Sequence, residues 1–315
     1  METTTGEEGE DLKIQVASDL HLELPLAIPR FGECLRDHFG VAEAELPVLG
    51  HALALLGDIG YPRKEGYAEF LVQQAARFEK VFVVAGNHEF YSGAGINTHY
   101  EEVRKDIAEI CSRAPNLHFL DKTSMFWRGY RILGCTLWSH IPPEAKAVVT
   151  KSQTDFRAIV LADEKEGGKK RKVTTEDISA WHAEELAWLK AELQQAQDRG
   201  EKVIVMSHHA PLLRGISNPH HDGGATRFAY GSDLTDILQE PIKAWLFGHT
   251  HWSSTQRTNK GIIVSSNQLG YFVKGEHSLG DGTRFDPHHM VHCRADGSVS
   301  VQHRHWSERR TRKKE

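Results

Sequence analysis

The chain has 315 residues, enough for one large domain or two small ones with a sizeable hydrophobic core. Hydrophobic residues make up 39% of it, and no run approaches the roughly 20 apolar residues that a membrane-spanning helix needs. Charged residues make up 26%, and the formal net charge of -5 gives no general attraction to nucleic acid or anionic lipid. This composition indicates a globular protein with no membrane partner.

The two ends of the chain differ in composition from the rest. Residues 1–11 are acidic and lack apolar periodicity, so we expect a flexible tail rather than a secretion signal. Residues 303–315 form a basic tail, which leaves 12–302 for a single domain. The four cysteines are far apart and form no CxxC pair, as is typical of a reducing compartment. We therefore expect a cytoplasmic protein, with a nuclear address in the basic tail as the alternative.

Short continuous apolar runs recur along the chain, each followed by glycine or polar residues. Such runs are typical of strands buried on both faces of a sheet, and they lie at 13–17, 51–56, 81–85, 130–136, 203–207, 244–247 and 261–265. Helical periodicity marks 66–79, 98–110 and 174–197; the last begins at a capping sequence and carries an apolar stripe of Trp181, Trp188, Leu189 and Leu193. The charged segment 163–172 predicts a surface loop. Alternating strands and helices predict an α/β fold with helices covering the sheets.

Polar side chains follow five of these predicted strands at the point where each strand ends. They are Asp19 and His21 after the first, Asp58 after the second, Asn87, His88 and Glu89 after the third, His208 and His209 after 203–207, and His249 and His251 after 244–247. Ligands of α/β proteins bind beyond the carboxyl ends of the strands, so we expect these side chains to converge. Carboxylate, amide and imidazole groups in this number suit two metal ions that share a carboxylate.

In chain order these motifs are Asp-x-His, Gly-Asp, Gly-Asn-His-Glu, His and Gly-His-x-His, and together they resemble the calcineurin-like metallophosphoesterases. The resemblance extends over about residues 12–300 and is strongest to a poorly characterised cytosolic branch of that family. It implies a layered αββα sandwich with two central mixed sheets flanked by helices. Secondary matches to the branch include Thr154, Asp155, Phe156 and Arg157, and the Gly270-Tyr271 pair.

The resemblance also implies a set of metal ligands. One divalent ion would be held by Asp19, His21, Asp58 and His251, and a second by Asp58, Asn87, His208 and His249. Asp58 would bridge the two, since a shared carboxylate and a shared hydroxide offset the repulsion of cations roughly 3.5–4 Å apart. Oxygen and imidazole ligands without thiolate favour Mn, Fe, Zn or Co over Mg. The family pattern favours His208 over His209, and adjacent residues at a strand end tend to point to opposite sides.

The implied activity is hydrolysis of a phosphomonoester or phosphodiester by attack of the bridging hydroxide, with a small-molecule phosphoester as the expected substrate. His88 resembles the family histidine that donates a proton to the leaving group or orients the phosphate. Glu89 is expected to accept a hydrogen bond from a histidine. Candidates for contact with the ligands or with substrate are His209, Asp155, Arg157, Arg214 and Tyr230, together with a predicted mobile loop around His220 and His221.

Two branches of the family are set aside on their own motifs. Serine/threonine phosphatases carry phosphate-binding arginines where this chain has Ile59 and Ala85. Purple acid phosphatases use a tyrosinate ligand at the spacing of Tyr61, but they have glycine in place of His21, so we expect Tyr61 to line a pocket or pack in the core.

Two functions of other classes stay open. A nuclease of the same superfamily would be supported locally by the basic runs at 169–172 and 309–314. A metal-binding scaffold without catalysis is the second alternative, although no metal-site histidine of the family pattern is lost here. The sequence leaves the oligomeric state and the role of residues 141–180 open.

Overall fold

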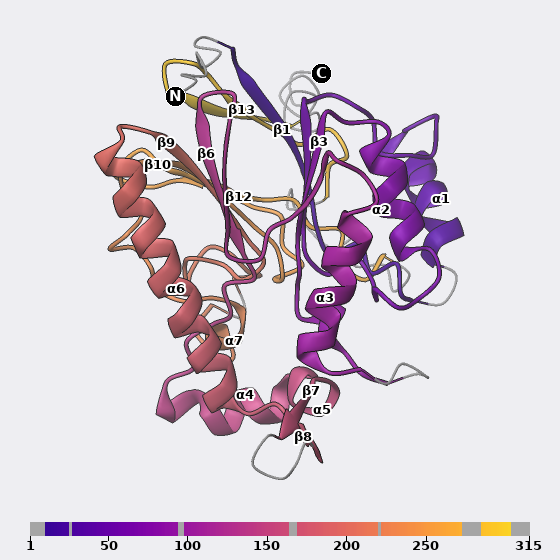
Figure 1. Ribbon diagram of the computed structural model, residues 1–315, viewed down its shortest axis with the longest axis vertical. Coiled ribbons are helices and arrows are strands. Elements are labelled where there is room, and N and C mark those ends of the chain that lie inside the picture. The colour runs from indigo at the N-terminus through magenta and orange to yellow at the C-terminus, as the bar shows by residue number, and fades with distance from the viewer. Residues whose placement is uncertain are drawn as a thin grey trace, which may run out of the picture.

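The computed structural model describes residues 10–24, 27–93, 98–163, 169–219, 222–272 and 285–303. Most of the two predicted tails, and both histidines of the predicted loop at 220–221, lie outside this part of the chain. Within it, the strands form two six-stranded sheets, which stack face to face, and a separate two-stranded hairpin (Figure 1). No helix in the described ranges combines the length and the apolar character needed to cross a membrane.

The first sheet has the order β14 (Val299–Gln302), β13 (Met290–Cys293), β1 (Leu12–Ala17), β2 (Ala52–Leu56), β3 (Lys80–Val84) and β4 (Leu117–Phe119). Strands β1 to β4 are parallel, while β13 and β14 continue the sheet antiparallel to their neighbours. Ala17 pairs with Leu55, and Leu55 pairs with Val83. The segments that follow β1, β2 and β3 therefore leave the sheet at the same edge.

The second sheet has the order β11 (Thr255–Arg257), β12 (Ile263–Ser266), β10 (Ile242–Phe247), β9 (Lys202–Ser207), β6 (Tyr130–Cys135) and β5 (Thr123–Trp127). Its four central strands are parallel, and the two edge strands are antiparallel. Both sheets are thus mixed, as predicted.

Three hydrophobic layers explain why the sequences of the strands are continuous apolar runs. Residues such as Ile14, Leu56 and Ile204 fill the space between the sheets. The alternate residues face outward, against α1 (Ala27–Phe39), α2 (Tyr67–Ala75) and α3 (Tyr100–Cys111) on one side, and against α6 (Thr175–Asp198) on the other. Because both faces of each central strand are buried, hydrophobic residues are favoured at every position. The predicted αββα sandwich is confirmed (Figure 1).

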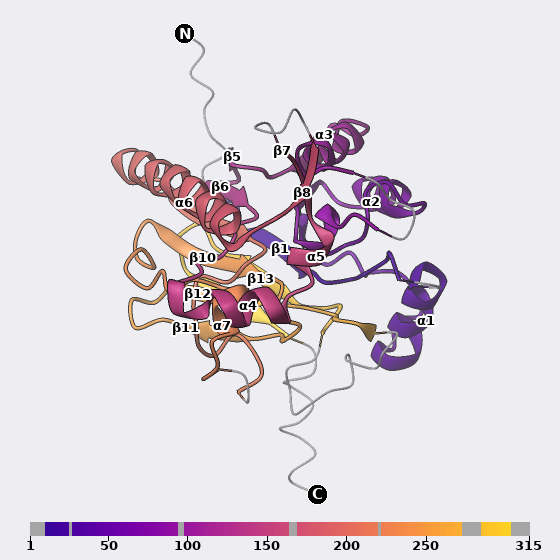
Figure 2. The same ribbon diagram turned by 90° about the horizontal axis from the view of Figure 1, so that it is seen from below.

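The segment between β6 and α6 forms a cap at one end of the molecule, drawn lowest in Figure 1 and facing the viewer in Figure 2. The cap contains η2 (Pro143–Ala145), α4 (Lys146–Ser152), α5 (Asp155–Ala158) and the antiparallel hairpin of β7 (Val160–Asp163) and β8 (Lys169–Lys172). The prediction of a surface loop over 163–172 is therefore wrong at 163 and at 169–172, which are in strands, while 164–168 lie outside the described residues. Strand formation there follows from pairing with the buried residues Val160 and Leu161, and from an ion pair between Arg171 and Asp177.

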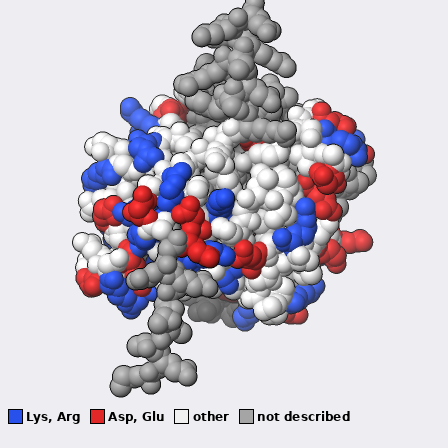
Figure 3. All heavy atoms as spheres, turned by 90° about the horizontal axis from the view of Figure 1, so that it is seen from above, with Lys and Arg blue, Asp and Glu red and all other residues white. Residues whose placement is uncertain are grey.

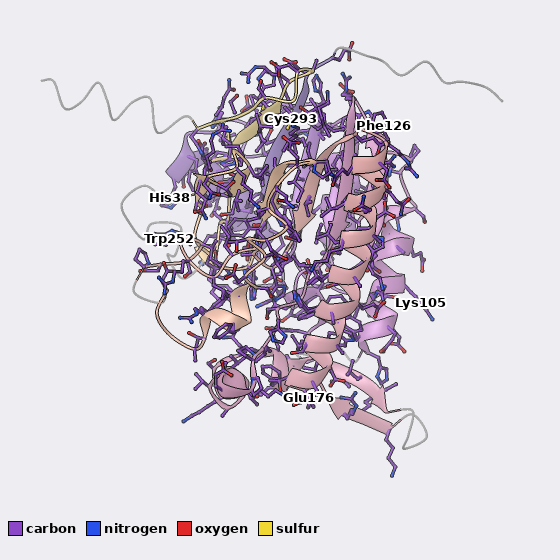
Figure 4. All side chains as sticks on the ribbon, turned by 90° about the vertical axis from the view of Figure 1, so that its left-hand side faces the viewer. His38, Lys105, Phe126, Glu176, Trp252 and Cys293 are labelled. Carbon is purple, nitrogen blue, oxygen red and sulfur yellow. The ribbon has the colours of Figure 1, made fainter. Side chains whose placement is uncertain are left out.

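Helix α6 begins as predicted, at a capping box in which Thr174 and Asp177 satisfy each other's backbone N–H groups. The predicted stripe is confirmed for Leu189 and Leu193 and wrong for Trp181 and Trp188. Buried positions include His182 and Glu185 beside Leu189 and Leu193, whereas Trp181 and Trp188 are only partly buried. Figure 4 shows the helix running along one side of the molecule, with Glu176 at the end near the cap.

The buried Glu185 predicts a pH dependence of stability. Burial raises the pKa of its carboxyl to about 8, although the N–H of Trp138 donates to it at 2.9 Å. A raised pKa means that stabilisation present below the unfolded pKa is lost as pH rises towards the folded value. We expect Glu185→Gln, which cannot ionise, to gain roughly 2–4 kcal/mol in unfolding free energy over wild type between pH 5 and pH 8, since one pKa unit is about 1.4 kcal/mol. Urea unfolding of both proteins with chelator, at pH 5 and at pH 8, measures this gain. A difference in unfolding free energy between variant and wild type that is the same at the two pH values would contradict the prediction.

Candidate metal centre

The segments that follow β1, β2, β9 and β10 bring two groups of ligand-type side chains together at the carboxyl edges of the sheets, and a third group, His21, Glu23 and His88, adjoins them. In one group, atoms of Asp19, His21, Asp58 and His251 all lie within 4.8 Å of one another. In the other group, atoms of Asp58, His208 and His249 do so. Asp58 belongs to both groups, and the segments come from both sheets.

The backbone at these positions is held in a conformation that side chains rarely favour. Five of the residues have a left-handed backbone: Asp19 (φ 55°), His21 (φ 49°), Asp58 (φ 54°), His249 (φ 75°) and His251 (φ 50°). Each such residue costs on the order of 1 kcal/mol or more, so the surroundings must enforce it. The N–H groups of Asp19 and His21 donate to the carbonyls of Gly57 and Asp58, and the N–H of His249 donates to the carboxylate of Asp19. Strain of this kind concentrates at functional sites.

Two glycines of the motifs allow the segments to approach closely. A Cβ atom on Gly57 would lie 2.3 Å from Nδ1 of His208, and one on Gly86 would lie 2.2 Å from Oδ1 of Asp58. No side chain fits at these distances. The glycines of Gly-Asp and Gly-Asn-His-Glu therefore leave room for the polar groups that meet here.

In the first group, nitrogen and oxygen atoms converge on one point. Nε2 of His21 lies 2.9 Å from Nε2 of His251 and 4.0 Å from Oδ2 of Asp58. Nε2 of His251 lies 3.5 Å from Oδ1 of Asp19, whose Oδ2 accepts a hydrogen bond of 2.5 Å from the hydroxyl of Ser18. Four donor atoms from three segments thus lie within 4.8 Å of one another, close enough for one metal ion to bind all of them.

In the second group, Nε2 of His208 lies 3.1 Å from Nδ1 of His249, 3.5 Å from Oδ1 of Asp58 and 3.0 Å from Oδ1 of Asn87. The other nitrogen of each ring faces a backbone carbonyl: Nδ1 of His208 lies 2.8 Å from the oxygen of Leu56, and Nε2 of His249 lies 3.2 Å from that of Ala229. A carbonyl partner requires an N–H on that nitrogen and leaves the inward nitrogen with a lone pair.

Asp155, one of the predicted contact residues, orients the proposed ligand Asn87. The Nδ2 group of Asn87 donates to Oδ1 of Asp155 at 2.8 Å and to the hydroxyl of Tyr91 at 2.9 Å, and that hydroxyl donates to the same carboxylate oxygen. Both NH₂ protons of the amide are engaged, so its oxygen is the atom that faces His208. Asp155 is buried, and it connects the cap to the candidate metal centre.

The electrostatics of the centre suit divalent cations. Burial raises the pKa of Asp58 well above its usual range, and the charges of Glu89 and Asp19 raise it further. Burial lowers the pKa of His208 and His249, with neighbouring histidines adding to the shift, so both imidazoles are neutral and able to bind a metal. In the described part of the chain, neither Asp58 nor Asp19 has a Lys or Arg partner. Buried carboxylates need a counter-charge, and the donor set fits divalent metal ions as its source.

His88 lies beside the two groups and is partly exposed, as is His251 of the first group, whose side chain is 20% exposed. The side chain of His88 is 13% exposed, and its backbone N–H donates to Oδ1 of Asp58 at 2.8 Å. Nδ1 of the ring lies 3.0 Å from Oε1 of Glu23, and Nε2 lies 3.1 Å from the hydroxyl of Tyr271. Glu23 was not among the predicted site residues, although its position two residues after His21 was an available signal.

Glu89 has partners other than the expected histidine. Its carboxylate accepts three backbone N–H groups, those of Asp58, Ile59 and Gly86, at 2.8–2.9 Å. The 3₁₀ turn η1 (His88–Phe90) directs the side chain into the backbone of the turn after β2. The expectation of a histidine donor is therefore wrong for Glu89, and the carboxylate that meets histidines is that of Glu23.

The other predicted contact residues divide into near and distant sets. The ring of His209 is buried and lies 4.3 Å from that of His249, and the ring of Tyr230, in α7 (Arg227–Tyr230), lies 5.3 Å from it. Arg157 and Arg214 are exposed, and within the described ranges neither bonds to a ligand-type side chain of the centre. Tyr61 packs partly buried against the core beside α1 to α3, as expected of a packing residue.

A two-sheet sandwich with such groups at its carboxyl edges is the architecture expected of a metallophosphoesterase. The model of the calcineurin-like phosphoesterase family matches residues 12–253, and the chain belongs to this family. It is similar to the uncharacterized protein L509 of Acanthamoeba polyphaga mimivirus, with 32% identity over 228 residues, 70% of this chain and 78% of that one. The fold is similar to that of the phosphopantetheinyl hydrolase PptH from Mycobacterium tuberculosis, with a TM-score of 0.58, 19% identity and coverage of 87% and 95% of the two chains.

Proposed function

We propose that this protein is a phosphoric ester hydrolase that uses two divalent metal ions. The observation that carries the proposal is that Asp58 belongs to both groups of ligand-type side chains. Its Oδ2 faces His21 in the first group, and its Oδ1 faces His208 in the second, at 4.0 Å and 3.5 Å from the respective Nε2 atoms. One carboxylate shared in this way is what a pair of closely spaced cations needs.

The proposed ligands of the first ion are Asp19, His21, Asp58 and His251, and those of the second are Asp58, Asn87, His208 and His249. The choice of His208 over His209 is supported by direction. Nε2 of His208 faces Asn87 and His249, whereas Nδ1 of His209 is turned towards the carbonyl of Thr136. Tyr230 and His209 would then pack around His249 and keep its ring in place.

Hydrolysis would divide between the ions and the protein. When bound, the two cations supply charge neutralisation for the phosphoryl oxygens and activation of water. With both ring nitrogens protonated and Nδ1 facing Glu23, His88 would donate the Nε2 proton to the departing oxygen, while its backbone N–H holds Asp58 in place. We propose a small-molecule phosphoester as substrate and a cytoplasmic location.

A nuclease is less well supported by the structure. The basic strand β8 lies in the cap, yet Arg171 is paired with Asp177. On the face opposite the cap, seen in Figure 3, basic and acidic side chains are interspersed rather than gathered into one basic surface. A scaffold without catalysis is disfavoured because the candidate ligands lie together with their orienting partners.

Metal reconstitution with a substrate screen tests the proposal. We expect close to two bound ions per chain after dialysis with Mn²⁺, Fe²⁺, Zn²⁺ or Co²⁺, together with turnover of at least one aryl or alkyl phosphate mono- or diester. Mg²⁺ should be a poor substitute, because it prefers six oxygens and keeps its waters, whereas most of these ligands are imidazoles. Elemental analysis that finds well under one ion per chain with every one of these metals would refute the dinuclear assignment.

A further inference from the structure

We propose that Glu23 is a positioning residue that fixes the tautomer and the orientation of two histidines of the centre, His21 and His88, through a single carboxylate oxygen. The inference deepens the proposed function, and it rests on that function only for the roles given to the two histidines.

The geometry is that of one acceptor shared by two rings. Oε1 of Glu23 lies 3.0 Å from Nδ1 of His21 and 3.0 Å from Nδ1 of His88. The two rings meet edge to face, with centroids 4.5 Å apart and planes at 70°. Each ring thus presents its Nδ1 edge to the same oxygen.

A carboxylate oxygen only accepts hydrogen bonds, so each of these Nδ1 atoms must carry a proton. Both histidines are then held as the Nδ1–H tautomer, and the lone pair lies on Nε2. In His21 this is the atom that lies 2.9 Å from Nε2 of His251, inside the first ligand group. In His88 it is the atom 3.1 Å from the hydroxyl of Tyr271. The tautomer that Glu23 selects therefore leaves Nε2 of His21 able to bind a metal ion, and leaves Nε2 of His88 able to take up the proton that an acid would pass on.

Packing alone does not explain a carboxylate at this position. Glu23 is 5% exposed, and in the described ranges its carboxylate meets the two imidazoles and no Lys or Arg side chain. Lys64 lies close, but its ammonium group donates to the backbone oxygen of Glu23 and not to the carboxylate. Burying a carboxylate with no basic partner other than histidines costs folding free energy. Its presence here therefore indicates that the hydrogen bonds to the two imidazoles serve a function.

The turn after β1 aims the side chain. The N–H of Leu22 donates to the carbonyl of Ile59, and the N–H of Leu24 donates to that of His21. The first bond fixes the backbone before Glu23 relative to the turn after β2, and the second closes the turn that contains Glu23. The position of the carboxylate is therefore set by the same two segments that carry His21 and Asp58.

Two variants and a matched control test the assignment. Glu23→Leu removes the acceptor, while Glu23→Gln keeps one neutral acceptor oxygen, which forms weaker hydrogen bonds than a carboxylate. Glu185→Gln makes the same change at an equally buried glutamate that faces the backbone of Trp138 instead of these histidines. Circular dichroism identifies any variant that does not fold, in which case Glu23→Gln carries the test.

The first readout is the tautomer of His21 and His88, from long-range ¹H–¹⁵N spectra of histidine-labelled protein with and without Zn²⁺, assigned with His21→Gln and His88→Gln. We expect Nδ1–H for both rings in wild type and in the control, and a shift of at least one ring towards Nε2–H in the Glu23 variants. The second readout is Zn²⁺ affinity by chelator competition. We expect one of the two bound ions to weaken by about 10–100-fold in Glu23→Leu, less in Glu23→Gln and not in the control.

An Nε2–H tautomer in wild type, or Glu23 variants with unchanged spectra and unchanged Zn²⁺ affinity, would overturn the inference. Neither measurement uses a phosphoester. A protein with no turnover but with the expected spectra would refute the hydrolase proposal and leave the role of Glu23 intact. A protein that turns over a phosphoester but lacks the expected spectra would refute the role of Glu23 and leave the hydrolase proposal intact.

Discussion

Asp58→Asn is expected to lose bound metal and activity together. The amide oxygen can still accept the backbone N–H of His88, so local structure should survive. What disappears is the anionic charge that faces both ligand groups. A bound metal ion contributes several kcal/mol of transition-state stabilisation, so its loss corresponds to a fall of about 10³-fold or more in kcat/KM. Elemental analysis and kinetics on the same reconstituted sample measure both effects.

The stability of the metal-free protein provides the control for this variant. Burial, together with Glu89 and Asp19, raises the pKa of Asp58 well above its usual range, so in the metal-free protein this carboxyl gives up its proton less readily than an ordinary aspartate and is closer in charge to an amide. We therefore expect metal-free Asp58→Asn to unfold within about 1 kcal/mol of wild type, the scale of one neutral hydrogen bond. Asn87→Ala should lose less metal, because a neutral amide is a weak ligand. Equal metal occupancy in wild type and Asp58→Asn would contradict the bridging role.

The central architecture could be predicted because burial on both faces leaves a direct mark on the sequence. Strands β1, β2, β3, β6, β9, β10 and β12 are each close to a predicted apolar run. The elements that were missed lack that mark. Strand β8 is the clearest case, since its side chains are basic and only its pairing with buried β7 residues explains a strand there. Helix α1 was also missed.

Convergence of the ligand-type residues could be predicted because parallel strands place their carboxyl ends at one edge. The direction in which each supporting side chain points could not be predicted. Glu89 follows His88 directly, but a 3₁₀ turn directs its carboxylate to backbone N–H groups. Glu23 follows His21 by two residues, and a tight turn directs its carboxylate to imidazoles. Asp155 likewise reaches Asn87 from a cap that is distant in sequence. Such contacts depend on tertiary packing rather than on local pattern.

The role of His88 can be separated from that of its neighbours by the leaving group. An aryl oxide departs readily as an anion, whereas an alkoxide needs a proton. In His88→Gln the backbone N–H that holds Asp58 is retained, and the side-chain amide can still donate to Glu23, so the change is mainly the loss of the imidazole. If His88 donates the proton, kcat/KM for an alkyl phosphoester should fall by about 10²–10⁴-fold, and that for the matched aryl ester much less.

The comparison must be made at equal metal occupancy, because His88 adjoins Asn87 and contacts Asp58 through its backbone. Tyr271→Phe removes the hydroxyl that lies 3.1 Å from Nε2 of His88 and leaves the imidazole itself. We expect its effect to be small and similar for the two esters, because the hydroxyl would orient the ring and positioning is shared by all substrates. A fall in His88→Gln that is the same for aryl and alkyl esters would remove the acid role from His88. The remaining candidates would then be His209, whose ring packs 4.3 Å from that of His249, and water held at the centre.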